Sequence, residues 1–458
     1  MTDYTGKRVL VIGAARQGLA LTRFLVQRGA FVTLNDQRTA EQMQAAIDAL
    51  AGLPIQWELG SHPAILADRS DLVCASGGVP LTLAPIQRAL QLGIPVSNDS
   101  QIFMEEVPCP VIAITGSAGK TTTTTLVGRM AQAGYTNGKV WIGGNIGLPL
   151  IDLVDQVQVN DLVVLELSSF QLELMTASPH IGAILNITPN HLDRHGTMEA
   201  YAAAKAKMIL HQTSRDTAVL GRDDPVAWSF ASRVQGRLVS FGFNRPGIAQ
   251  IGTYLDKDTL SLQTEDRNEP LMSTDVIKLR GEHNIANTLA ACAIAYAAGL
   301  PLGCMKAGVA EFTGVPHRLQ FVRTCNGASW YNDSIATAPE RTIAAIHSFT
   351  EPLVLLLGGR DKNLPWENLA DLVHQRVDHL VIFGEAAEKI ATAIGSVQPG
   401  RLPLTIDRCA SLKEAVAAAA SRAESGDVVL FSPGGTSFDE FQDFEQRGER
   451  FQEWVQAL

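Results

Sequence analysis

Ile114-Thr115-Gly116-Ser117-Ala118-Gly119-Lys120-Thr121-Thr122 is the stretch that decides the fold, because it directly follows an apolar run and directly precedes a helical pattern. Glycines let backbone N–H groups surround phosphate oxygens, and the start of the next helix adds positive potential. Lys120 would neutralise the β and γ phosphates, and the Thr121 hydroxyl would bind Mg²⁺. A chance glycine-rich turn is the alternative, since the first glycine stands closer to Gly119 than in the common motif. The strand-loop-helix context favours a phosphate loop.

Strand-like apolar runs, each followed by small or turn-forming residues, recur along all 458 residues and predict α/β domains with parallel sheets. They form three blocks, with expected domains at 1–101, 102–314 and 315–458. The inserted stretch 245–280 should form short strands and turns. The expected strands are Arg8–Ile12, Ala30–Leu34, Val111–Ile114, Leu162–Leu165, Ala183–Leu185, Leu353–Leu357, His379–Phe383 and Val428–Phe431.

The composition excludes several classes of protein. A net charge of -10 argues against a broad nucleic-acid or anionic-membrane surface, which needs clustered Lys and Arg. The six cysteines contain no C-x-x-C pair, which argues against a disulfide framework or a cysteine zinc site. No apolar run approaches the roughly 18 residues of a membrane helix, and no signal peptide precedes the first strand. We expect a cytoplasmic protein with no nucleic-acid or membrane partner.

Two polar groups follow predicted strands in the second block. Glu166 ends an apolar strand, so its carboxylate should emerge where ligands bind in open α/β sheets and could hold Mg²⁺. A solvated strand-end glutamate is the alternative. His191 and His195 stand four residues apart in PNHLDRHG. Zinc is the lesser alternative there, because no glutamate follows the first histidine, and a role near phosphate or Mg²⁺ is favoured.

The first block carries a broken dinucleotide fingerprint. Gly13 and Gly18 stand at its ends, but Ala15 replaces the middle glycine. Asp36 ends the next strand, where a ribose-binding acid would stand. A strand-turn-helix without a cofactor is the alternative. Together with the phosphate loop, this site suggests two nucleotide substrates.

In chain order, these and later motifs resemble the Mur ligase family over the whole chain, and most closely its glutamate-adding members. The motifs are TGSAGKTT (115–122), GNIG (144–147), ELSSFQLE (166–173), NIT (186–188), HLDR (191–194), GEHNIAN (281–287), PHR (316–318), NDS (332–334), SP (432–433) and FEQRG (444–448).

The resemblance implies a Rossmann-like N-terminal domain, a P-loop ATPase-type central domain and a Rossmann-like C-terminal domain that closes over both. It implies an ATP-dependent, ADP-forming amide ligase of peptidoglycan precursor synthesis, with ATP and Mg²⁺ and acting as a monomer. The expected substrates are UDP-N-acetylmuramoyl-L-alanine and D-glutamate, joined through an acyl phosphate. The alternative is a related ligase that uses L-glutamate or another amino acid.

The resemblance also implies roles for individual residues. The ATP set is Gly116, Ser117, Ala118, Gly119, Lys120, Thr121, Thr122, Asn284, Asn287, Arg318 and Asp333. The catalytic set is Lys120, Glu166, His191 and Lys205, and the metal set is Thr121, Glu166, His191 and Lys205. The UDP-substrate set is Asp36, Arg38, Asn145 and His191, and the glutamate set is Thr337, Lys362, Ser437 and Phe444.

Lys205 matches a lysine that the family carries as a carbamate, whereas its sequence context alone indicates a solvated helix lysine. The chain also departs from the family pattern. Ile335 follows Asn-Asp-Ser where a lysine is common, 338–340 replaces an asparagine-containing turn, and the loop 14–17 differs, so uracil contacts cannot be transferred. Rival classes are a nucleotide-sugar oxidoreductase, which would leave the phosphate loop unused, and a P-loop ATPase without a UDP-sugar substrate.

Overall fold

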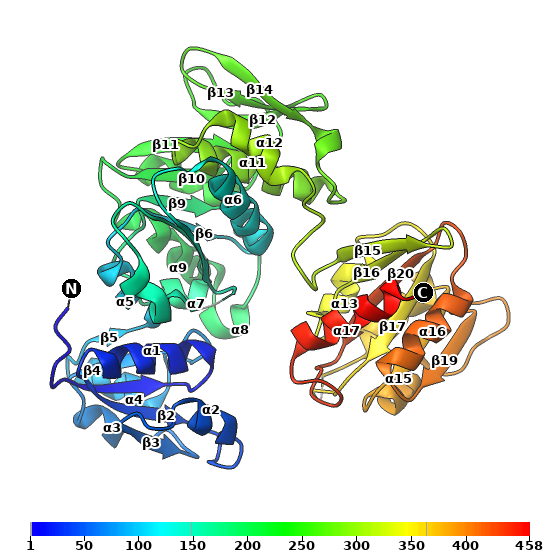
Figure 1. Ribbon diagram of the computed structural model, residues 1–458, viewed down its shortest axis with the longest axis horizontal. Helices are drawn as coiled ribbons and strands as arrows, with labels where there is room; N and C mark the ends of the chain where they lie inside the picture. The colour runs from blue at the N-terminus through cyan, green and yellow to red at the C-terminus, as the bar shows by residue number, and fades with distance from the viewer. Residues whose placement is uncertain (1, 148, 363) are drawn as a thin grey trace. The chain divides into compact units, whose positions relative to one another are not determined.

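The computed structural model describes residues 2–147, 149–362 and 364–458. It contains three sheets, and the chain divides into two compact units (Figure 1). Unit 1 comprises 1–278 and 282–312, and unit 2 comprises 279–281 and 313–458. The α/β class and the three sheet-containing parts confirm the expected fold class. The domain limits expected from the sequence stay predictions.

The first sheet of unit 1, blue to cyan in Figure 1, is parallel with strand order β3-β2-β1-β4-β5. Along β1, Val9 and Val11 join one apolar core while Leu10 and Ile12 join another, so both faces are buried. This explains an uninterrupted apolar run. The strands are β1 Arg8–Ile12, β2 Phe31–Asp36, β3 Ile55–Leu59, β4 Leu72–Ala75 and β5 Val96–Ser97. The helices are α1 Arg16–Gln27, α2 Gln44–Ala49, α3 Ile65–Asp68, α4 Ala84–Gln91 and α5 Asp99–Glu106.

The second sheet of unit 1 has strand order β14-β13-β12-β11-β10-β9-β6-β8-β7. The pairs from β7 to β12 are parallel, and β13 and β14 add an antiparallel meander that confirms the short strands expected in 245–280. The strands are β6 Val111–Thr115, β7 Val140–Gly144, β8 Leu162–Glu166, β9 Ile181–Ile184, β10 Thr217–Gly221, β11 Arg237–Phe241, β12 Gly252–Asp256, β13 Thr259–Gln263 and β14 Asn268–Ser273.

Strands β6, β8 and β9 are neighbours, so their carboxyl ends meet at one edge. The helices of this part are α6 Lys120–Gly134, α7 Ser169–Leu172, α8 Leu192–His195, α9 Met198–Leu210, α10 Pro225–Ser229, α11 Glu282–Ala297 and α12 Leu302–Val309. The 3-10 helices are η1 Leu150–Gln156, η2 Phe230–Arg233 and η3 Thr274–Val276. The phosphate loop, Glu166 and the turn that contains His191 all follow these three strands.

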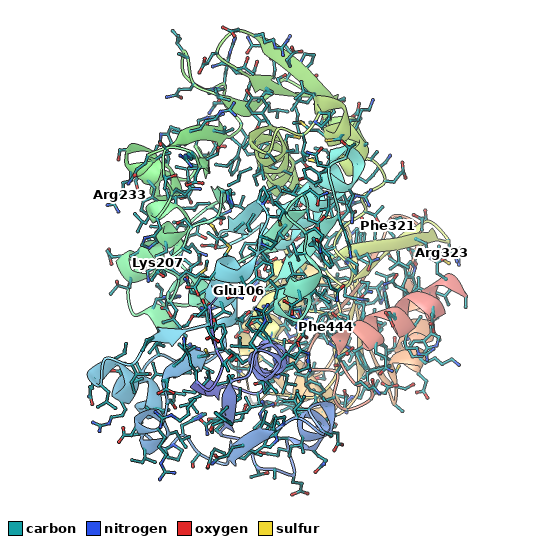
Figure 2. The ribbon with its side chains drawn as sticks, turned by 60° about the vertical axis from the view of Figure 1, so that its left-hand side comes forward. Glu106, Lys207, Arg233, Phe321, Arg323 and Phe444 are labelled. Carbon is teal, nitrogen blue, oxygen red and sulfur yellow. The ribbon has the colours of Figure 1, made fainter. Side chains whose placement is uncertain are left out.

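Unit 2 is one further doubly wound sheet with strand order β15-β16-β20-β17-β18-β19, antiparallel only between β15 and β16. Along β17, Leu355 and Leu357 join one core while Val354 and Leu356 join the other. The strands are β15 Gln320–Cys325, β16 Ala328–Asn332, β17 Leu353–Gly358, β18 His379–Phe383, β19 Thr405–Cys409 and β20 Val428–Gly434. The helices are α13 Pro339–Ile346, α14 Glu367–Arg376, α15 Ala387–Ile394, α16 Leu412–Arg422 and α17 Phe444–Gln456; Figure 2 labels Phe444, which begins α17.

Within the described ranges, no helix is both long enough and apolar enough to cross a membrane.

Candidate active site

The phosphate loop occupies the turn between β6 and α6. Gly119 is the N-cap of α6 with φ +81°, a left-handed conformation that favours glycine. A Cβ atom at this position would lie 2.2 Å from Asn287 Oδ1 on α11, so a larger residue would have to displace the Asn287 side chain. Asn287 donates in turn to Asn284 Oδ1 at 3.1 Å. The expected ATP residues of α11 therefore lie beside the loop.

Residues after β9 hold the loop in shape. Ser117 N–H donates to Asn186 O at 2.9 Å, and Ala118 N–H donates to Asn186 Oδ1 at 2.8 Å. The Ser117 hydroxyl contacts Thr188 O and Tyr201 Oη. These hydrogen bonds tie the backbone of the loop to the segment after β9 and to α9. Neither Asn186 nor Tyr201 was among the expected site residues, although both lie in or near the quoted motifs.

Two lysines converge on the same turn. Lys120 Nζ donates to Gly116 O at 2.9 Å, and Lys205 Nζ from α9 also donates to Gly116 O at 2.9 Å and contacts Thr115 Oγ1 at 3.3 Å. Lys205 is 1 % exposed, so its interpretation as a solvated helix lysine is wrong. The face of α9 that carries Lys205 packs on the sheet. The weak amphipathic pattern of this helix does not show which of its faces is buried. Burial, together with the charge of Lys120, lowers the pKa of Lys205 to about 7 against the opposing effect of Glu166.

Glu166 lies at the carboxyl end of β8, and it is 1 % exposed rather than solvated. Its Oε1 accepts a hydrogen bond from Asn145 Nδ2 at 2.9 Å. Its Oε2 is buried and has no hydrogen-bond partner among the residues that the structure describes. A buried carboxylate oxygen left in this way is costly unless a cation completes it. The structure thus joins Asn145, Glu166 and Lys205, with Thr121 and Thr122 in the first turn of α6 after Lys120.

The two histidines of the α8 turn differ sharply. His191 has a left-handed backbone with φ +54°, and its ring packs on Phe170 at 5.1 Å between centroids. His195 directs Nδ1 to Glu173 Oε1 and Nε2 to Ser169 Oγ, each at 2.9 Å. Both ring nitrogens of His195 therefore have protein partners, which argues against the zinc alternative. Among the described residues, no three His, Cys, Asp or Glu side chains are grouped to hold a metal without help from substrate oxygens.

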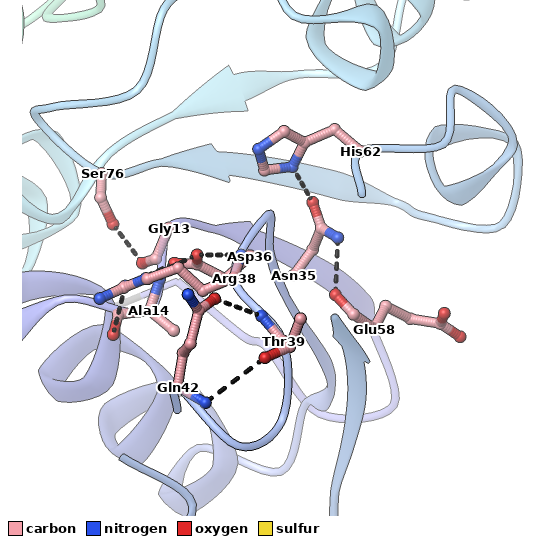
Figure 3. A network of polar contacts seen from close by, with 10 residues as sticks. All are labelled: Gly13, Ala14, Asn35, Asp36, Arg38, Thr39, Gln42, Glu58, His62 and Ser76. Carbon is pink, nitrogen blue, oxygen red and sulfur yellow. Dashed lines mark hydrogen bonds and ion pairs between the residues drawn. The ribbon is translucent and has the colours of Figure 1, made fainter. Parts of the chain in front are cut away.

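In the first sheet, Asp36 and Arg38 form a tight network around the turn after β1 (Figure 3). Asp36 accepts hydrogen bonds from Ala14 N–H at 2.9 Å and from Arg38 Nε and Nη2 at 2.9 and 2.7 Å. Burial acts to raise the pKa of Asp36, but the hydrogen bonds from Arg38 and Ala14 lower it to about 2. A ribose could reach this carboxylate only by displacing one of these donors. Asn35, the residue before Asp36, contacts the His62 ring and the Glu58 carbonyl (Figure 3). Neither His62 nor Glu58 was among the residues expected from the sequence.

In unit 2, Lys362 Nζ donates to Thr337 Oγ1 at 3.3 Å, so the structure joins two residues of the expected glutamate set. Burial, with Arg341 and Arg447 nearby, lowers the pKa of Lys362. Arg447 is fully buried and donates to Ser334 Oγ, Ser334 O and the Gly435 carbonyl. Arg341 and Arg447 were not singled out individually from the sequence. Together with Lys362 they supply positive charge in this region, where Ile335 stands in place of the lysine that is common in the family.

The other expected residues of unit 2 lie close by in the fold. Ser437 is 2 % exposed, and the carbonyl of Phe444 accepts the Ser334 hydroxyl at 2.8 Å. Asp333 accepts from Ser432 Oγ and Leu319 N–H, and burial raises its pKa to about 7 despite these bonds. Arg318 acts on Asp333 through its charge. The expected ATP set is thus divided between the two units, with Asn284 and Asn287 in unit 1 and Arg318 and Asp333 in unit 2.

Comparison with known families accounts for most of the chain. Three family descriptions match: Mur ligase MurD-like N-terminal domain at 7–98, Mur ligase middle domain at 114–295, and Mur ligase glutamate ligase domain at 317–435. A relative from Symbiobacterium thermophilum, named UDP-N-acetylmuramoylalanine--D-glutamate ligase, is 40% identical over 99% of this chain and 98% of its own. The chain belongs to the Mur ligase family. A protein of the same name from Geotalea uraniireducens is also 40% identical, over 100% of this chain and 98% of its own.

Solved Mur ligase structures share the fold. The UDP-N-acetylmuramate-alanine ligase MurC from Thermotoga maritima superposes with a TM-score of 0.55 at 20% identity, covering 98% of this chain and 99% of its own. MurF ligase from the same organism, solved in complex with ADP, gives a TM-score of 0.53 at 19% identity, covering 99% of this chain and 96% of its own. These likenesses confirm the three-part architecture that the sequence predicted.

Gly119→Ala tests the geometry of the phosphate loop. The new Cβ would meet Asn287 Oδ1, and the left-handed backbone alone costs an alanine about 1–2 kcal/mol. We expect ATP affinity to fall at least roughly tenfold, as measured by calorimetric titration. Gly93→Ala is the matched control, because Gly93 follows α4 with φ +69° and no atom lies near its Cβ position. An unchanged ATP affinity in Gly119→Ala would show that the loop does not hold nucleotide.

Proposed function

We propose that this chain is an ATP-dependent, ADP-forming ligase that joins D-glutamate to UDP-N-acetylmuramoyl-L-alanine in cytoplasmic peptidoglycan precursor synthesis. Relatives 40% identical over the whole chain bear this activity in their names. The observation that carries the proposal is the convergence of Lys120, Lys205 and the buried carboxylate of Glu166 at one sheet edge. An anionic phosphate chain and an anionic substrate carboxylate can both be neutralised there.

The chemistry follows from charge neutralisation. A carboxylate oxygen of the UDP substrate attacks the γ-phosphorus of ATP. The bond between this phosphorus and the β-γ bridging oxygen breaks, which forms an acyl phosphate and releases ADP. The glutamate amine then attacks the acyl carbon and phosphate leaves. Lys120 offsets the charge that develops on the phosphoryl group, and loop N–H groups hold the phosphates in line. The proton released by the amine passes to solvent or to a basic group of the site.

The residues present suit Mg²⁺. Oxygen donors are what Mg²⁺ prefers, and it usually takes only one or two protein ligands beside waters and substrate phosphates. Glu166 offers a buried Oε2 with no hydrogen-bond partner among the described residues, and Thr121 offers a hydroxyl at the start of α6. When bound, Mg²⁺ would neutralise phosphate charge and orient the γ-phosphate for attack. Asn145 holds Glu166 in place through its Oε1.

Lys205 is a candidate for carbamylation. Only a neutral amine reacts with carbon dioxide, and the pKa of Lys205 is lowered to about 7 by its buried position. The resulting carbamate would replace a buried cation beside Lys120 with an anion, which removes the repulsion from Lys120 but adds one from Glu166 that a bound cation would offset. The carbamate would also add an oxygen ligand near Glu166. We assign His191 separately, to the muramoyl end of the UDP substrate.

Glutamate binding is assigned to unit 2. Thr337, Lys362, Ser437 and Phe444 combine a hydroxyl, a cation, a second hydroxyl and an aromatic surface, which suits a dicarboxylate with an aliphatic middle. Lys362 contacts Thr337 and makes no ion pair with the residues that the structure describes, so its charge is available to a carboxylate.

A phosphate-release panel tests the proposed function. ATP and Mg²⁺ are incubated with UDP-N-acetylmuramoyl-L-alanine and each of D-glutamate, L-glutamate, L-alanine and diaminopimelate. We expect release to require both the UDP substrate and D-glutamate, and Lys120→Ala to lower kcat by about 10²–10³. Release without the UDP substrate would indicate a P-loop ATPase instead, and nicotinamide binding would indicate the oxidoreductase class.

Lys205 carbamylation predicts a pH-dependent requirement for bicarbonate. As pH falls through about 7, the amine becomes protonated and less of it can react. Added bicarbonate should therefore stimulate activity more at about pH 6 than at about pH 8, roughly one unit below and above that pKa. Lys205→Ala should be inactive and partly rescued by small carboxylic acids. Lys413→Ala, an exposed helix lysine, is the control. The idea fails if ¹³C-bicarbonate gives no carbamate signal that depends on Lys205.

Lys362→Ala should raise the KM for D-glutamate without changing the KM for the other two substrates. Losing a hydrogen bond to a charged group costs about 1.5–3 kcal/mol, which is roughly 10- to 150-fold in KM for D-glutamate. Because Lys362 is not among the residues expected to bind ATP or the UDP substrate, the KM values for these two substrates should change little. Steady-state kinetics with each substrate varied in turn provides the measurement, with Lys413→Ala as control. An equal rise in all three KM values would contradict the assignment.

A further inference from the structure

His195 occupies a position that the reaction described above does not use. Its side chain is 1 % exposed, at the end of the short helix α8. A carboxylate without its proton can only accept, so Nδ1 carries a hydrogen that is donated to Glu173 Oε1. In the neutral imidazole, Nε2 then accepts from the Ser169 hydroxyl at 2.9 Å. Both partners belong to the segment that directly follows β8, so the ring joins two strand-end loops.

The ring faces of His195 are engaged as well. One aromatic neighbour is Phe170, stacked at 5.2 Å with only 3° between the ring planes. The other is Tyr201 on α9, at 5.1 Å. Tyr201 contacts the Ser117 hydroxyl in the phosphate loop at 2.9 Å and carries Lys205 Nζ over its ring at 4.8 Å. His195 therefore contacts, directly or through one side chain, three segments that bear candidate catalytic groups.

The α8 turn needs such an anchor because its backbone is strained at His191. A left-handed conformation is uncommon for a residue other than glycine and persists only when its surroundings enforce it. Arg194 N–H and His195 N–H both donate to His191 O at 3.0 Å, so the position of His195 sets that of His191. Phe170 lies against both histidine rings, and the Arg194 guanidinium lies 4.7 Å from its centroid.

Glu173, which accepts the hydrogen bond from His195, is itself held in place. Lys207 Nζ donates to the Glu173 carbonyl (Lys207 is labelled in Figure 2). Glu173 N–H donates to Ser169 O, so Glu173 and Ser169 belong to one helical turn. Ser169 and Glu173, the two hydrogen-bond partners of His195, are therefore held in a fixed arrangement in the segment that follows Glu166.

We propose that His195 is a positioning residue: clamped by Glu173 and Ser169 and stacked on Phe170, it sets the place of the His191 ring relative to the strand end that carries Glu166. The proposal rests on the proposed function for the role of His191. Ligating or substrate-facing groups typically lose about 10- to 100-fold in activity when their outer partners are removed.

A double-mutant cycle tests this inference. His195→Phe keeps a ring to stack but removes both hydrogen bonds; His195→Gln retains a polar side chain, and Glu173→Gln removes only the charge. We expect His195→Phe to lower kcat about 10- to 100-fold while the KM for D-glutamate and the calorimetric Kd of ATP stay near wild type. Adding His195→Phe to His191→Ala should cost little more than His191→Ala alone, because both changes act through one ring. Additive losses, or a lower Tm with unchanged kinetics, would overturn the proposal.

Hydrogen exchange separates failure of this inference from failure of the proposed function. In His195→Phe, protection should fall at the amides of 194–196 and remain in α9, whether or not the protein uses the UDP substrate. Unchanged protection at 194–196 would reject the positioning role. An inactive wild-type protein in the phosphate-release panel would instead reject the proposed function and leave the exchange result readable.

Discussion

The cost of burying Glu166 is the constraint on which the rest of the site depends. A carboxylate that is 1 % exposed, with one oxygen lacking a hydrogen-bond partner among the described residues, is unstable without positive charge. The fold answers this need with Asn145 on one oxygen and with Lys205 close enough to interact electrostatically. Lys205 is itself buried, and in its unmodified, protonated form its charge and that of Glu166 stabilise each other. Glu166 at the end of β8 and Lys205 on α9 thus place charge beside the phosphate loop, where an anion would bind.

The same edge of the sheet gathers parts that are far apart in the chain. Asn186 shapes the phosphate loop from the end of β9, and Asn287 on α11 closes the space above Gly119. His195 ties the turn after β9 to the segment after β8. Asn186 and His195 both follow β9, and they contact segments that follow β6 and β8. Parallel pairing brings the ends of these three strands together. The chemistry is therefore distributed over the sequence but confined to one edge in space.

Sequence reasoning predicted the buried strands well because residues on both faces of a parallel sheet must be apolar. His379–Phe383 matches β18 at both ends, and Leu353–Leu357 differs from β17 by one residue. The strand-loop-helix arrangement around 114–122 and the short strands of 245–280 were also predicted correctly. The interpretation of Lys205 from its local sequence was wrong, because the side chain is not solvated, and burial also excludes the alternative of a solvated Glu166. A single charged residue in a helix or at a strand end carries no local signal of burial, since its environment depends on which element packs over it. For the same reason Arg447, fully buried through backbone carbonyl acceptors, could not be distinguished from a surface arginine.

By itself, the sequence determined the α/β class, the place of the phosphate loop and the family resemblance, because these depend on local patterns: apolar runs, glycines where the backbone must turn, and the order of short motifs. Only the tertiary structure decided that Asp36 is engaged by Ala14 and Arg38, that Lys362 meets Thr337, and that His195 is clamped between Glu173 and Ser169. Those contacts join residues separated by up to dozens of positions, and their strength depends on burial and on the partner's charge. Periodicity records which face of an element is apolar, whereas a hydrogen bond or a shifted pKa exists only after two elements have packed against each other.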